Sequence, residues 1–460
     1  MRPIAVIGGG PAGYVAAITA AQQGQNVLLI TEGPLGGTCL NEGCMPTKSL
    51  LESADTYELV KNAENLGIRL SSKSIEIEWS VVQQKKEEIV RTLVQGIQYL
   101  MKKNKIRLIQ GSASFITNQR LRINNGEQQE EVEVSKVIVA SGSEPISLPF
   151  APFDGEWVIH SGQAMSLPSI PSSLLIIGGG VIGCEFASIY SRMGTKVTVV
   201  EMGKQLLPSE DPDIAEILHR KLADDGVTIH TSTSVTDLNV DKKQILIQFQ
   251  DGTIQDLQAD YVLVAIGRKP RVHGLGIEGI GVDFSKQGIA VDEYMQTNIP
   301  SIYACGDVIG GIQLAHVAFH EGRVAALNAC DQAEIVNYRA VPRCIYTSPE
   351  IASVGLTEEQ ARQQYGDIKV GEFPFSANGK ARISNETIGK VKVLVEPQYN
   401  EILGISIVGP HATELIGQGT IMLHAEITTD VLENLIMAHP TLSESIHEAL
   451  LSTSGHAVHV

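Results

Sequence analysis

The chain has 460 residues, of which 43% are hydrophobic and 19% charged, and its formal net charge is −17. This length exceeds what one hydrophobic core holds, so two or three domains are expected. The acidic balance argues against nucleic acid or an anionic membrane as partners, because both require a basic face. Six cysteines are too few for a secreted disulfide scaffold. We find no signal-peptide pattern and no apolar run near the ~18 residues of a membrane span, which predicts a cytoplasmic protein.

The first pattern along the chain is an internal repeat. Residues 4–31 and 174–201 align without a gap at an offset of 170, and each copy reads as strand, glycine-rich turn, amphipathic helix and strand. In such a βαβ unit one glycine permits the tight turn, the next lets the backbone approach a pyrophosphate, and the last lets helix pack on strand. The matching glycines are Gly8, Gly10 and Gly13 in the first copy and Gly178, Gly180 and Gly183 in the second. A lone GxGxxG would be weak evidence, but two gapless copies predict two dinucleotide sites.

The acid at the end of the second strand of such a unit normally holds the adenosine ribose hydroxyls. In the second copy this residue is Glu201, whose carboxylate would repel a 2′-phosphate, so this site is expected to prefer NAD over NADP. The first copy has Thr31 at the aligned position and an acid, Glu32, one residue later. Two interpretations of Glu32 stay open: it reaches the ribose from a kinked strand end, or it is a solvated loop carboxylate.

A pair of cysteines follows the first glycine turn. Cys39 and Cys44 lie five residues apart in GGTCLNEGCMPTK at 36–48. Two unrelated buried thiols are the plain alternative, and metal binding would need two further ligands that are not evident. Pro46 suits the first turn of a helix, and a thiolate near a helix N-terminus is stabilised and reactive. We therefore predict a redox-active dithiol and no metal.

Two histidine patterns are less specific. His439 precedes a proline and lies five residues before Glu444, which could hold one imidazole nitrogen and leave the other free as a base. A surface histidine near a helix start is the common alternative. His316 and His320 are four residues apart and could chelate a metal, but without a third ligand packing or hydrogen bonding is favoured. The four other cysteines are interpreted as reduced structural thiols.

The order of apolar runs and turns predicts an α/β fold with two Rossmann-like dinucleotide-binding domains and a C-terminal α+β domain. After about residue 340, alternating runs predict antiparallel strands flanked by helices. The expected first dinucleotide domain spans 1–146 and is completed by 271–338, the second dinucleotide domain spans 147–270, and the C-terminal domain spans 339–460.

Taken together, these segments resemble the pyridine nucleotide–disulfide oxidoreductases, most closely the members that oxidise dihydrolipoamide in 2-oxo acid or acetoin dehydrogenase complexes. The resemblance covers nearly the whole chain. It is carried by GGGPAG at 8–13, GGTCLNEGCMPTK at 36–48, GGGVIGCE at 178–185, AIGRKP at 265–270, YACGDVIGGIQLAH at 303–316, VPRCIYTSPEIASVGLTE at 341–358 and HPTLSE at 439–444. It implies FAD in the first site, NAD in the second, a homodimer formed through the C-terminal domain, and a lipoyl-bearing acyltransferase subunit as partner.

The resemblance also implies residue roles. Cys39 would be the interchange thiol that attacks the substrate, and Cys44 would lie against the flavin as a charge-transfer thiolate. His439, supplied by the other subunit and oriented by Glu444, would be the acid–base group. Lys48 and Glu185, which taken alone could be solvated, would form an ion pair near the flavin. The further implied cofactor contacts are Gly8, Gly10, Pro11, Ala12, Gly13, Glu32, Gly37, Thr38, Gly111, Ser141, Gly142, Gly306, Asp307 and Ala315 for FAD, and Gly178, Gly180, Val181, Ile182, Gly183, Glu201 and Gly267 for NAD.

One residue departs from the family pattern: Thr31 stands where an acid is usual, which leaves the partner of the FAD ribose open. The absence of any cysteine after Cys344 speaks against mercury reduction, and Glu201 speaks against the NADPH-dependent glutathione reductases. Two other functions stay open, namely an NAD(P)H-dependent reductase of another small disulfide, and a flavoprotein that serves a larger complex without turnover. The intact dithiol and the His439–Glu444 pair argue against the second.

Overall fold

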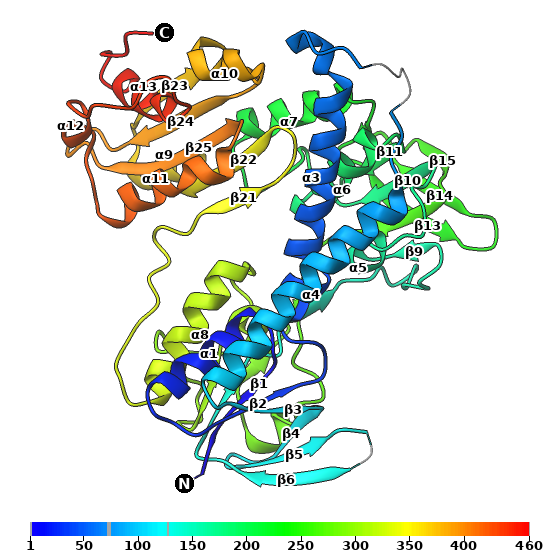
Figure 1. Ribbon diagram of the computed structural model, residues 1–460, viewed down its shortest axis with the longest axis vertical. Coiled ribbons are helices and arrows are strands. Elements are labelled where there is room, and N and C mark those ends of the chain that lie inside the picture. The colour runs from blue at the N-terminus through cyan, green and yellow to red at the C-terminus, as the bar shows by residue number, and fades with distance from the viewer. Residues whose placement is uncertain (1, 71–74, 127, 460) are drawn as a thin grey trace.

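The computed structural model describes residues 2–70, 75–126 and 128–459. Figure 1 shows two α/β units and a C-terminal sheet with its own helices; the long helix α4 (Trp79–Lys103) runs from the first unit to the second, and α3 (Cys44–Lys61) lies beside the second unit. Within these ranges, no helix combines the length and the apolar character that a bilayer crossing requires.

The first unit is a five-stranded parallel sheet in the order β20-β7-β1-β2-β3. Its residues alternate between two apolar clusters. Ile4 and Val6 face helices α1 and α8, whereas Ala5 and Ile7 face the antiparallel sheet β4-β5-β6. A parallel strand covered on both faces is apolar throughout, which explains the uninterrupted run IAVI. The elements are β1 (Ile4–Ile7), α1 (Pro11–Gln22), β2 (Val27–Thr31), α2 (Gly37–Asn41), β3 (Arg107–Gln110), β4 (Ser112–Thr117), β5 (Arg120–Asn124), β6 (Gln129–Glu133), β7 (Lys136–Val139), β18 (Phe284–Ser285), β19 (Gly288–Ile289), β20 (Ile302–Ala304) and α8 (Ala315–Ala329).

The second unit repeats this plan in the order β12-β11-β10-β16-β9, again with an antiparallel three-stranded sheet, β13-β14-β15. The predicted repeat is confirmed down to the helix ends, because α6 (Val181–Arg192) is α1 displaced by the same offset of 170. The glycines that open the two turns adopt φ values of 112° at Gly8 and 107° at Gly178, a region that side chains rarely enter. The other elements are β9 (Val158–Ile159), α5 (Ser161–Ala164), β10 (Ser173–Ile177), β11 (Lys196–Val200), α7 (Pro212–Asp224), β12 (Thr228–His230), β13 (Ser234–Asn239), β14 (Gln244–Gln248), β15 (Ile254–Gln258) and β16 (Tyr261–Val264).

Paired strands and helical packing join the units. The strands β8 (Ser143–Pro145) and β17 (Arg268–Pro270) pair antiparallel where the chain enters and leaves the second unit. Helix α3 also crosses over: its buried residues Leu50, Leu51 and Ala54 belong to the same apolar cluster as the residues of α6 and β11. The helix that starts at the cysteine pair therefore packs in the core of the second unit, although its sequence lies within the first.

The C-terminal region is a five-stranded antiparallel sheet in the order β21-β22-β25-β24-β23. Helix α11 packs on β22 and β25, and α13 packs on β23 and β24. This arrangement confirms the predicted α+β region. The elements are β21 (Arg343–Ile345), β22 (Glu350–Gly355), α9 (Glu358–Tyr365), β23 (Lys369–Pro374), α10 (Gly379–Ser384), β24 (Lys390–Val395), β25 (Ile402–Gly409), α11 (Ala412–His424), α12 (Thr429–Leu432) and α13 (Glu444–Ser452).

Candidate active site

Both glycine turns, the cysteine pair and β21 line one cavity of about 1660 Å³. Every predicted cofactor contact lines this cavity except Gly13 and Gly183. A Cβ placed on these two glycines would lie 1.8 Å from the Gly8 carbonyl oxygen and 2.0 Å from that of Gly178, respectively. They therefore allow the helix to pack on the strand, as predicted for the third glycine of each turn.

The middle glycine of each turn leaves room for a ligand. A Cβ on Gly180 would meet no atom within 4 Å, and one on Gly10 would come no nearer than 3.8 Å to another heavy atom. Each lines the cavity and is the N-cap of a 12-residue helix, whose first amides need an acceptor. The open space and the helix N-terminus fit a pyrophosphate at both turns. The cavity therefore fits one dinucleotide on each unit.

The acids after the second strands differ between the units. Glu201 lines the cavity, and its carboxylate accepts the Gly179 N–H at 2.6 Å and also the Gly203 N–H. In the first unit Glu32 also lines the cavity, but its carboxylate pairs with Arg271. Glu32 is thus a half-exposed, ion-paired residue at the cavity wall, and its contact with an FAD ribose stays a prediction.

The two thiols of the cysteine pair differ in pKa. Cys39 belongs to α2 and Cys44 begins α3, and both thiols are free. The hydrogen bond from Cys39, aided by Lys48 and opposed by burial, lowers the pKa of Cys44 to about 7. The same hydrogen bond, together with burial, raises the pKa of Cys39. The thiolate therefore forms more readily on Cys44 than on Cys39.

Lys48 and Glu185 form an ion pair that joins α3 to α6. The Lys48 Nζ lies 2.8 Å from Glu185 Oε1, and only 5% of the Glu185 side chain is exposed. The Tyr346 backbone N–H donates to the same carboxylate at 3.1 Å, and its ring centroid lies 4.5 Å from the Lys48 Nζ. Of the two interpretations made from the sequence, solvated charges or a pair, the structure confirms the pair.

Changing Lys48 to Met is expected to raise the pKa of the Cys44 thiol above its value of about 7. The substitution removes the nearby ammonium and leaves the Glu185 carboxylate, which itself raises the pKa of Cys44. The pH dependence of alkylation of the reduced protein measures this pKa, because the thiolate is the reactive form. Lys61→Met, at the other end of α3, is the matched control, and an unshifted profile for the Lys48 variant would contradict the prediction.

The structure contains a chain of hydrogen bonds, from Arg268 through Ser143 to Asp307, that the sequence did not predict. The Ser143 hydroxyl donates to Asp307 Oδ2 at 2.5 Å, and the Arg268 Nε donates to the Ser143 hydroxyl at 2.8 Å. All three line the cavity. Arg268 belongs to the family-like segment AIGRKP, which could have marked it, whereas nothing in the sequence distinguishes Ser143 from other loop serines.

The predicted histidine–glutamate pair is present but lies outside the wall of the cavity that the dithiol lines. The His439 Nδ1 lies 2.9 Å from Glu444 Oε1, and the Thr441 N–H donates to Glu444 Oε2 at 2.7 Å. The His439 side chain is 78% exposed, and the residue is not part of the cavity wall. A single chain therefore orients His439 through Glu444 without bringing it to Cys39.

The other histidine pattern has a structural explanation. The His316 Nε2 lies 2.9 Å from the carbonyl oxygen of Pro342, a contact between α8 and the segment that enters β21. This agrees with the hydrogen-bonding interpretation of the His316–His320 spacing. The four remaining cysteines, Cys184, Cys305, Cys330 and Cys344, are free thiols in the structure.

Comparison with known proteins identifies the family. Residues 2–322 match the family model described as pyridine nucleotide-disulphide oxidoreductase, and residues 341–450 match the dimerisation domain of that family. The chain is 56% identical over 456 residues to a dihydrolipoyl dehydrogenase of Bacillus subtilis, with 99% of both chains covered. It is 37% identical to the dihydrolipoyl dehydrogenase of Geobacillus stearothermophilus, covering 99% of this chain and 97% of the relative.

Solved structures agree with this result. LpdA from Mycobacterium tuberculosis superposes with a TM-score of 0.90 at 28% identity, covering 98% of this chain and 99% of the other. The HOCl-induced flavoprotein disulfide reductase RclA from Escherichia coli, in its Cu(II) complex, gives a TM-score of 0.87 at 30% identity over 98% of both chains. With the glycine turns and the dithiol on one cavity, the chain belongs to the pyridine nucleotide–disulfide oxidoreductases.

Proposed function

We propose that the protein is a homodimeric dihydrolipoyl dehydrogenase that oxidises protein-bound dihydrolipoamide to lipoamide, with FAD as cofactor and NAD⁺ as electron acceptor. The observation that carries this proposal is the single cavity of about 1660 Å³ shared by the cysteine pair and both nucleotide turns. Electrons from a dithiol substrate can then reach a nucleotide without crossing solvent. The full-length relatives named dihydrolipoyl dehydrogenase support this substrate.

In the reaction, a substrate thiolate attacks the sulfur of Cys39 in the Cys39–Cys44 disulfide. The S–S bond breaks, Cys44 leaves as a thiolate, and a mixed disulfide joins the substrate to Cys39. The second substrate thiolate then attacks the substrate sulfur of the mixed disulfide, which forms lipoamide and releases Cys39. The two electrons now reside on the dithiol. Bound FAD supplies the two-electron chemistry that connects the dithiol to NAD⁺.

The unequal pKa values of the two thiols favour Cys39 as the sulfur that is attacked and Cys44 as the sulfur that leaves. A thiol of lower pKa leaves faster, so Cys44, with a pKa of about 7, suits the leaving position. The Lys48–Glu185 pair stands beside it and, through the ammonium, stabilises its charge. Cys39, whose pKa is raised, suits the position that is attacked and later re-protonated.

The acid–base group is His439 of the second subunit. The exposure of His439 and its place outside the cavity wall of its own chain support this assignment, as does the match of residues 341–450 to a dimerisation domain. In the dimer, the free Nε2 of His439 takes the proton of the attacking substrate thiol, while Glu444 holds Nδ1. A lipoyl-bearing acyltransferase subunit of a 2-oxo acid or acetoin dehydrogenase complex presents the substrate.

An anaerobic titration tests the proposal. Dihydrolipoamide is added to the purified FAD-containing protein, the absorption spectrum is recorded, and NAD⁺ follows. We expect a long-wavelength band to form with dihydrolipoamide and to disappear with NAD⁺. If only NADPH reduces the flavin, the enzyme acts on another disulfide. If neither reduces it, the chain binds its cofactors without turnover.

A further inference from the structure

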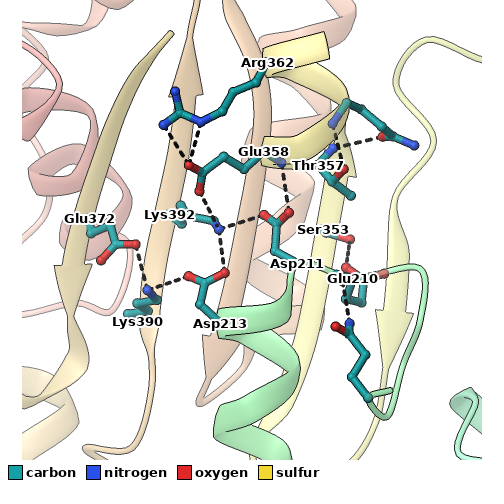
Figure 2. Close-up of polar contacts among 12 residues, drawn as sticks. Glu210, Asp211, Asp213, Ser353, Thr357, Glu358, Arg362, Glu372, Lys390 and Lys392 are labelled. Carbon is teal, nitrogen blue, oxygen red and sulfur yellow. Dashed lines mark hydrogen bonds and ion pairs between the residues drawn. The ribbon is translucent and has the colours of Figure 1, made fainter. Parts of the chain in front are cut away.

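The chain between β11 and α7 is tied to the C-terminal sheet by buried charges, which Figure 2 shows. The Lys392 Nζ on β24 lies 2.8 Å from Asp211 Oδ2 and 2.7 Å from Asp213 Oδ1, both at the start of α7. The Lys390 Nζ lies 2.7 Å from Asp213 Oδ2, and Glu358 Oε2 lies 3.3 Å from the Lys392 Nζ. We call Asp211, Asp213, Glu358, Lys390 and Lys392 the interdomain ion cluster.

Lys392 and Asp211 lie at the buried centre of this cluster, so each needs an opposite charge beside it. Only 1% of the Lys392 side chain and 2% of the Asp211 side chain are exposed. Burial lowers the pKa of Lys392, but the hydrogen bond from its ammonium to Asp213 and the ion pair with Asp211 outweigh that effect and raise it. The ammonium therefore stays charged. Without it, Asp211 would be a buried carboxylate with no cation beside it, which is strongly unfavourable.

A second contact ties the same segment to the same sheet. Glu210 Oε1 accepts from the Arg343 Nε at 3.0 Å, and Glu210 Oε2 accepts from the Ser353 hydroxyl at 2.6 Å. Arg343 belongs to β21 and Ser353 to β22. Because Glu210 and Arg343 also line the cavity, this contact connects the C-terminal sheet directly to the wall of the nucleotide site.

From this segment, hydrogen bonds lead back to the second glycine turn. The Glu210 N–H donates to the Leu207 carbonyl at 3.0 Å, and the Leu207 N–H donates to the Gly179 carbonyl at 2.8 Å. The Gly179 N–H in turn donates to Glu201 Oε2 at 2.6 Å. The loop 201–210 is thus held at one end by the glycine turn and at the other by the C-terminal sheet.

We propose that the interdomain ion cluster positions the loop 201–210 for NAD, so that the C-terminal sheet sets the nucleotide affinity of the second unit. Lys392 is the positioning residue: it touches no ligand and acts through Asp211 and Asp213. This inference rests on the proposed function, because it takes the second glycine turn as the NAD site. It predicts that a substitution on β24 changes nucleotide binding while leaving the dithiol chemistry intact.

The first test compares NAD⁺ binding to Lys392→Met and to the wild-type FAD-containing dimer by titration calorimetry. We expect the Kd for NAD⁺ to rise about tenfold, a usual size for coupling between connected sites. FAD content and reduction of the protein by dihydrolipoamide are expected to stay unchanged, and Lys392→Arg is expected to restore most of the affinity. Lys86→Met is the matched control, because Lys86 is also buried, with 4% exposed, but does not contact the loop.

The second test is amide hydrogen exchange of residues 201–211 in the same proteins. Faster exchange of the Leu207 amide in Lys392→Met, but not in Lys86→Met, supports the proposal. Wild-type NAD⁺ affinity together with wild-type exchange in Lys392→Met overturns it. If wild-type protein itself binds no NAD⁺, the proposed function fails instead. Should Lys392→Met not fold, Asp213→Asn takes its place, because the Asp213 side chain is 39% exposed and its loss is milder.

Discussion

Changing Cys39 to Ser is expected to reduce dihydrolipoamide oxidation by more than about 10⁴-fold, the scale seen when a residue that bonds covalently to the substrate is removed. A serine hydroxyl cannot form the mixed disulfide, so no electrons leave the substrate. The long-wavelength band is expected to be present in the Cys39 variant before any dihydrolipoamide is added, because its Cys44 thiol cannot form the disulfide. Steady-state assays with dihydrolipoamide and absorption spectra of the variant measure both effects.

Two further variants show whether the loss of turnover in Cys39→Ser comes from the missing thiol or from a general loss of folding or cofactor. Cys44→Ser is expected to lose turnover and the band together. Cys330→Ser, which changes a half-buried free thiol outside the cavity wall, is expected to retain both. Transfer of electrons from NADH to an artificial acceptor is expected to continue in all three proteins, since that reaction does not use the dithiol. Substantial turnover in Cys39→Ser would contradict the assigned mechanism.

Changing His439 to Gln is expected to lower turnover with dihydrolipoamide by about 10²–10⁴-fold, the range of a positioned acid–base group. The amide keeps the size of the side chain and a contact with Glu444, but it cannot accept the thiol proton. FAD content and NADH oxidation by an artificial acceptor are expected to stay near normal. Near-normal turnover with dihydrolipoamide would remove His439 from the mechanism.

Mixed dimers decide which subunit supplies the histidine. A dimer of one Cys39→Ser chain and one His439→Gln chain has two damaged chains. If His439 acts across the interface, one of its two sites combines an intact dithiol with an intact histidine, and activity returns. If His439 acts within its own chain, neither site is complete and the mixed dimer stays inactive. Co-expression with two different affinity tags allows the mixed species to be isolated and assayed.

The sequence predicts those parts of the fold that are marked by a repeated segment or by residues close together in the chain. The gapless repeat predicted both glycine turns, and the observed helices α1 and α6 keep its offset of 170. Pro46 predicted a helix beginning near Cys44, and α3 begins at that residue. For His439, spacing supplied only a partner in Glu444, and the catalytic assignment came from the family resemblance.

Contacts between distant segments could not be predicted in this way. Glu32 and Arg271 are 239 residues apart, and Asp213 and Lys392 are 179 residues apart. Each of these side chains is a common loop, helix or strand charge, with no spacing that marks a partner. These residues pair because the fold brings distant parts of the chain together. The hydrophobic periodicity of one segment does not predict which distant segment will pack against it. Ser143 beside Asp307 was missed for the same reason.

Helix α3 packs in the core of the second unit, which affects whether this unit can be moved to another protein. The repeat suggests that the second unit is portable, so that residues 147–270 could be excised or grafted into another protein. In the intact chain, however, its core is completed by Leu50, Leu51 and Ala54 of α3. A fragment of 147–270 would expose the apolar surface that these residues cover, and would tend to aggregate. An evolutionary or engineered transfer of the second unit therefore has to include the helix that bears the redox cysteine.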